Sequence, residues 1–145
     1  MSTRCNIGVY ENKEDKLDDF YALLYRHSDG YPEGVLPEIV PFLKWWDQQR
    51  GIGDTEYCGA RLLQYLCNQS DGGPAIKTAE LLNKNTDYTG IYGYGICKYI
   101  HWDIEYFYKI YPKAVEVYET PFKAFNDSTG KIDFKQWELT ETVKL

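Results

Sequence analysis

The sequence is poor in the residues that most metal and redox sites use. It has two histidines and four cysteines, and no two cysteines have the C-x-x-C spacing of a zinc knuckle or a redox motif. The glycine-rich stretch YTGIYGYG lacks the G-K-[ST] ending of a P-loop and is no dinucleotide fingerprint. We therefore expect no cofactor, and we expect reduced cysteines with structural roles.

Long apolar runs are missing as well. No stretch approaches the roughly 18 residues of a membrane span, and no apolar run follows Arg4 as it would in a signal peptide. These features predict a cytoplasmic protein without membrane contact.

Basic residues are outnumbered, with 16 Lys and Arg against 22 Asp and Glu, which gives a net charge of −6. Because phosphates repel an acidic surface, direct nucleic-acid binding is not expected. The charge favours a basic protein partner or a DNA-mimicking inhibitor.

Aromatic residues are abundant, at 17% of the chain, and 14 residues are tyrosine. Tyrosine provides rigid contact area with a polar tip, so it suits binding surfaces as well as small cores. At 145 residues the chain predicts a single domain, 1–145.

Hydrophobic periodicity predicts an α+β fold. Helix spacing appears over 34–49, where Pro41 predicts a kink or a late start, and again over 54–67 and near 76–84. The expected architecture is an antiparallel sheet of about five strands with two or three helices packed on one face. Alternation predicts strands at 3–10, 20–27, 99–111, 115–120 and 131–139.

The stretch YRHSDGYPEG, residues 25–34, predicts a corner between a strand and a helix. Asp29-Gly30 is a turn signal, and we expect the Asp29 carboxylate to accept backbone N–H groups there. The alternative is a binding loop, in which Arg26, His27 and Tyr31 lie near a helix N-terminus that could hold an anion.

Both histidines lie in H-x-D pairs, His27 with Asp29 and His101 with Asp103. On a strand, His101, Asp103 and Glu105 would share one face. Each pair can be a structural hydrogen bond, or all five residues can form a metal site through imidazole and carboxylate ligands.

Three further aromatic residues are candidates for binding. Trp45 and its neighbour Trp46 cannot both face the core, because successive helical positions diverge by about 100°. Trp45 is therefore a candidate contact residue, and the alternative is that it packs under the C-terminal segment. Tyr92 and Tyr94 lie in a Gly- and Tyr-rich segment that is either a flexible flap or an irregular part of the core.

The opening MSTR, the corner YRHSDGYPEG and, more weakly, DIEYFY resemble a family of small proteins from bacteriophages and mobile elements. That family opens M-[S/G]-T-R and carries a Y-x-x-x-D-G-Y-P corner. The resemblance is strongest over residues 1–50. It implies a phage-type accessory protein that acts in the host cytoplasm, with no catalytic residues to transfer.

A second likeness is to hydrolases with an N-terminal nucleophile. Removal of Met1 would expose Ser2, whose hydroxyl the free α-amine could activate. Arg26 and Asp29 have the R-x-x-D spacing found after the first hairpin of the choloylglycine-type members, which however begin with a cysteine.

The leading hypothesis from the sequence is a non-catalytic binding protein that inhibits a host factor, such as a defence system, by protein–protein contact. The alternative is a binder or sponge for a small anionic, nucleotide-like ligand. The N-terminal-nucleophile hydrolase is a second alternative.

Overall fold

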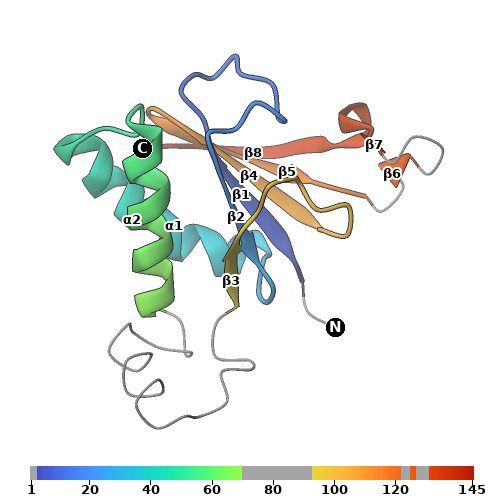
Figure 1. Cartoon of the computed structure of the whole chain (residues 1–145), viewed down its shortest axis with the longest axis horizontal. Helices are drawn as coiled ribbons and strands as arrows, with labels where there is room; N and C mark the ends of the chain where they lie inside the picture. The colour runs from blue at the N-terminus through green and yellow to red at the C-terminus, as the bar shows by residue number, and fades with distance from the viewer. Residues whose placement is uncertain (1–2, 70–92, 122–124, 127–130) are drawn as a thin grey trace, which may run out of the picture.

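The computed structural model describes residues 3–69, 93–121, 125–126 and 131–145, and it is an α+β structure built on an open sheet (Figure 1). The sheet has six strands in the order β3-β2-β1-β4-β5-β8. A separate two-stranded ribbon pairs β6 with β7. The strands are β1 (Cys5–Val9), β2 (Ala22–Arg26), β3 (Tyr94–Ile96), β4 (Tyr106–Tyr111), β5 (Ala114–Glu119), β6 (Phe125–Asn126), β7 (Lys131–Ile132) and β8 (Glu138–Lys144).

The described residues contain two α-helices, α1 (Pro32–Gln49) and α2 (Thr55–Gln69). Both agree with the predicted helices, but the predicted late start of the first is wrong. Pro32 lies in its first turn, where the missing N–H costs little. The predicted helix near 76–84 lies outside the described residues. Neither α1 nor α2 is long and apolar enough to cross a membrane.

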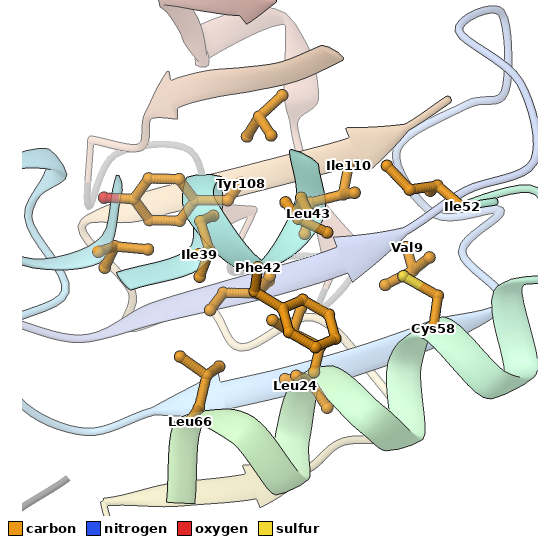
Figure 2. Packing of buried hydrophobic residues seen from close by; sticks show 14 of the residues in the cluster. Val9, Leu24, Ile39, Phe42, Leu43, Ile52, Cys58, Leu66, Tyr108 and Ile110 are labelled. Atoms are coloured by element: carbon orange, nitrogen blue, oxygen red, sulfur yellow. The ribbon is translucent and has the colours of Figure 1, made fainter. Parts of the chain in front are cut away.

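The two helices cover one face of the sheet, which we call the helix face. The alternating residues of β1, Cys5, Ile7 and Val9, point to this face and are fully buried. Figure 2 shows Ile39 and Leu43 of α1 among the buried side chains of the strands. The apolar residues that alternate along the strands and those that recur about every 3.6 residues along the helices therefore pack in one core.

The opposite face, which we call the loop face, is covered by irregular chain. Its buried cluster includes Tyr10, Leu23, Phe107 and Trp137. Part of the cover is the segment 97–105, which joins β3 to β4 and contributes Ile104 to this cluster. The sheet is thus a middle layer between helices and loops.

The predicted all-antiparallel sheet is corrected by one pair, because β1 and β4 are parallel. β3 is antiparallel to β2, and β2 to β1, so β3 and β4 run in the same direction. The chain between them must cross over β2 and β1, a distance of about 14 Å, and also return along the strands. Residues 97–105 make this connection.

Two predicted strands are corrected for related reasons. The strand expected at 99–111 begins only at Tyr106, because residues 97–105 are used by the crossover. The strand expected at 131–139 is instead β7, a 3-10 helix at Phe134–Gln136 and the start of β8. Trp137 ends that 3-10 turn and packs on Phe107 with ring centroids 5.2 Å apart. The ring of Trp137 is thereby buried in the cluster of the loop face.

Candidate functional site

The corner at residues 29–31 is built into the core of the protein. The Gly30 N–H donates to the Thr3 carbonyl at 2.9 Å, and the buried Tyr108 hydroxyl donates to the Gly30 carbonyl at 2.7 Å. A Cβ on Gly30 would lie 2.9 Å from the Thr3 oxygen, closer than real Cβ atoms come. Asp29 has a φ of 55°, in the left-handed region. The corner is therefore a scaffold joining β2 to α1.

The carboxylate of Asp29 makes a different contact from the predicted one. Its hydrogen bond in the structure comes from the hydroxyl of Tyr31 at 3.3 Å, rather than from backbone N–H groups. Both residues are exposed. Asp29 contributes to the corner mainly through its left-handed backbone, which Asp tolerates better than most residues.

Arg26 is held inside the protein, although it was a candidate for binding an anion. Its side chain donates to Glu38 at 2.6 Å and to the Ser28 carbonyl at 2.7 Å. Tyr94 donates to the same Glu38 oxygen at 3.1 Å, and burial raises the pKa of Tyr94 well above its usual range. Arg26 is only 7% exposed. The carboxylate of Glu38 thus occupies the place that an anionic ligand would take.

The histidines of the two H-x-D pairs both contact Tyr25. Its hydroxyl is 2.9 Å from Nδ1 of His27, and its ring stacks on His101 with centroids 4.5 Å apart. Asp103 forms an ion pair with Arg4, while its other oxygen is 3.6 Å from Nδ1 of His101. We call the residues that make these contacts the Tyr25 cluster: Arg4, Tyr25, His27, His101 and Asp103.

The predicted histidine–aspartate hydrogen bonds are therefore replaced by other pairings. His27 bonds to Tyr25, and Asp103 bonds to Arg4. Glu105 lines a hollow with Glu119 and Glu138 instead of joining His101, because residues 101–105 are not a strand. Within the described ranges no three His, Cys, Asp or Glu residues are placed to hold a metal ion.

The most exposed apolar surface lies on the segment 96–102, which the sequence interpretation missed. Ile96 is 77% exposed, Tyr99 71% and Trp102 58%. The segment lines a hollow of about 410 Å³. Ile96, Tyr99 and Trp102 are three positions apart. Strict strand alternation does not produce this spacing, so the sequence contained a sign that the segment is not a regular strand.

The segment 96–102 is held from beneath by buried polar groups. The side chain of Asn6 is fully buried, accepts the N–H of His101 at 2.8 Å and donates to the Leu24 carbonyl at 2.9 Å. The N–H of Cys97 donates to the Leu23 carbonyl at 2.9 Å. The exposed side chains are therefore presented on a fixed backbone, which lowers the entropy cost of binding.

Of the remaining candidates, the structure describes Trp45 but neither Ser2 nor Tyr92. Trp45 is 54% exposed on α1, which agrees with the contact alternative and not with packing under the C-terminal segment, and its ring packs near Phe42 and Trp46. Ser2 and Tyr92 lie outside the described residues. The hydrolase hypothesis rests on Ser2, Arg26 and Asp29, of which the structure describes the last two. Arg26 is hydrogen-bonded to Glu38.

Comparison with protein families, curated proteins and solved structures found no match to this chain.

Proposed function

We propose that the protein is a binding protein that contacts another protein through the segment 96–102, and that it acts as a phage-type accessory protein inhibiting a host factor. The observation that carries the proposal is the exposure of Ile96, Tyr99 and Trp102 on a segment held by Asn6. Tyr and Trp are the residues enriched at the energetic centres of protein interfaces. The phage context rests on the resemblance of the opening residues and the corner.

The surface proposed for this contact differs from the one that the sequence suggested. Tyr94 is committed to Glu38, so its hydroxyl supports the scaffold. Tyr31 and Trp45 remain exposed but lie on the corner and on α1. The segment 96–102 groups three large exposed side chains in one short stretch of chain, and this grouping favours it as the contact surface.

A capture experiment tests the proposal. The immobilised protein is incubated with bacterial host lysate, the retained protein is identified, and its affinity is measured after purification. Tyr99→Ala should weaken binding at least tenfold, because hot-spot truncations cost more than about 1.4 kcal/mol. Tyr57→Ala removes another exposed tyrosine ring, on α2, and should change affinity less than about twofold.

Two results would count against this assignment. If Tyr99→Ala and Ile96→Ala both retain full affinity while Trp45→Ala loses it, the contact surface is on α1. If no protein is retained at micromolar concentration, while circular dichroism shows a folded sample, inhibition by protein contact is refuted for that host.

A further inference from the structure

The strand β8 lies at one edge of the sheet and offers a long, accessible backbone (Figure 1). It pairs with β5 on one side, and no strand of the described residues pairs with its other side. Glu138–Lys144 spans seven residues, and six of the seven are exposed. An unpaired edge of this kind accepts an extended chain through its free N–H and C=O groups.

An apolar groove of about 470 Å³ lies beside this edge, between α1 and β8. Leu36 and Val40 of α1 and Val143 of β8 line it and are half-buried. The groove has a geometric cause. Six strands span about 24 Å between the outermost two, whereas two helices packed side by side cover about 20 Å. The helix face is therefore left incompletely covered at β8.

The helical wall of the groove carries hydrogen-bond acceptors. Pro37 and Pro41 both line the groove inside α1, and neither has a backbone N–H. The carbonyls of Glu33 and Pro37 consequently lack the i+4 donor that an α-helix normally supplies. These oxygens favour an occupant with many N–H donors, such as the side chains of lysine and arginine.

Charge at the groove points to the same occupant. Glu33 and Glu141 line it, and Glu138 lies further along β8. Lys144 is the one basic residue in the β8 sequence. A second copy of this chain would bring the same carboxylates and a net charge of −6 to the edge. A basic partner is complementary in charge to the carboxylates at the groove, whereas a second copy of this chain is not.

We propose that the outer edge of β8 and the α1–β8 groove bind an extended, basic segment of a partner protein by strand addition. Apolar side chains of the segment pack on Leu36, Val40 and Val143, and its lysine or arginine residues lie against Glu33 and Glu141. This surface is distinct from the segment 96–102, so either proposal can fail while the other stands.

The test uses a fluorescent peptide of sequence TKTVTKTVT, whose alternate residues are suited to a strand, and a control peptide TETVTETVT. Wild-type protein should bind the lysine peptide at least ten times more tightly than the glutamate peptide in fluorescence anisotropy. Glu141→Lys should abolish or reverse this preference. Glu56→Lys makes the same charge change at an exposed position of α2 and should leave the preference for the lysine peptide within twofold of wild type. Glu141→Gln should give an intermediate preference.

Hydrogen exchange identifies the mode of binding. The lysine peptide should slow exchange of the β8 amides, because strand addition satisfies them. Several results would overturn the proposal: no lysine-peptide binding at about 1 mM, an unchanged preference in Glu141→Lys, or protection confined to other elements. A wild-type dimer that Glu141→Lys dissociates would also overturn it, since a second copy would then occupy the edge.

Discussion

The two faces of the sheet are both buried, but they are built differently. On the helix face, the fully buried side chains of β4 and β5 are apolar apart from the Tyr108 hydroxyl, as in Ile110 and Val115. On the loop face, the same two strands bury Lys109 and Glu116, which are register partners and only 5% and 6% exposed. One strand pair therefore presents an apolar surface to one side and a mixed aromatic and charged surface to the other.

The difference follows from what covers each face. A helix satisfies nearly all its own backbone groups, so an apolar stripe is enough to receive it. A loop leaves carbonyls without partners, and the sheet must supply donors to them. Lys109 donates to the carbonyls of Lys13 and Asp15 at 2.7 and 2.6 Å, and Tyr10 donates to that of Leu17.

The same principle explains other buried polar groups on this side. Thr120 donates to the carbonyl of Ile104, and Asn6 accepts from His101. Glu116 accepts from Tyr111 at 3.0 Å and from Tyr118 at 2.9 Å. Lys109, Tyr10, Thr120 and Asn6 thus bond to the irregular chain that covers the loop face, whereas Glu116 bonds to Tyr111 and Tyr118 within β4 and β5.

The largest expected effect compares neighbouring residues of β4. Lys109→Met should lower the free energy of unfolding by about 2–4 kcal/mol, because two carbonyls lose their donor and Glu116 loses the cation of its register partner. Ile110→Met, one residue further and on the helix face, should cost less than about 1.5 kcal/mol. Urea denaturation measures both. If the two variants lose the same free energy of unfolding, the polar contacts of the loop face are no more important than the apolar packing of the helix face.

A smaller effect is expected in β1. Asn6→Ala should lower the free energy of unfolding by about 2 kcal/mol, since the His101 N–H and the Leu24 carbonyl lose their partner. Ile7→Val on the opposite face should cost about 1 kcal/mol.

The Asn6 variant also has a local readout. Asn6 contacts the sulfur of Cys97 at 3.6 Å, so its loss should loosen the segment 96–102 and speed alkylation of Cys97. Cys5, on the helix face, should remain unreactive at pH 8, because burial raises the pKa of its thiol to about 12. Burial raises the pKa of the Cys97 thiol and the hydrogen bond from Asn6 lowers it, so loss of that bond alone would slow alkylation, and faster alkylation therefore reports opening of the segment. Alkylation that is slower in Asn6→Ala than in wild type would show that Asn6 does not hold the segment.

The smallest effect concerns the corner that attaches α1 to the helix face. Asp29→Ala should lower the free energy of unfolding by about 1 kcal/mol, because alanine tolerates a φ of 55° poorly. Asp29→Gly should leave stability unchanged or slightly raised, since glycine adopts this conformation readily. Thermal melts distinguish the pair. If both variants lose the same stability, the carboxylate rather than the backbone is what the corner requires.

Much of the local structure was predictable because it depends on neighbouring residues. Alternation located β1, β2 and β5, and helical spacing located α1 and α2, since the period of burial is set by backbone geometry. The same geometry separated Trp45 from the core-facing Trp46, but it left open whether another segment covers Trp45. The candidate site was less predictable: Arg26 was expected to meet a ligand, and nothing local indicates that Glu38 and Tyr94 surround it.

The sequence by itself determined the α+β class, the strand–corner–helix path through Asp29-Gly30 and the abundance of aromatic contact residues. Only the tertiary structure decided that β1 pairs in parallel with β4, that residues 97–105 cross the loop face, and that β8 ends the sheet beside an open groove. Strand order and face coverage depend on pairings between residues far apart in the chain. Alternation of apolar residues predicts which side chains of a strand share a face. It does not predict which face the helices cover or where the exposed rings lie, because both depend on the order of all the strands in the sheet.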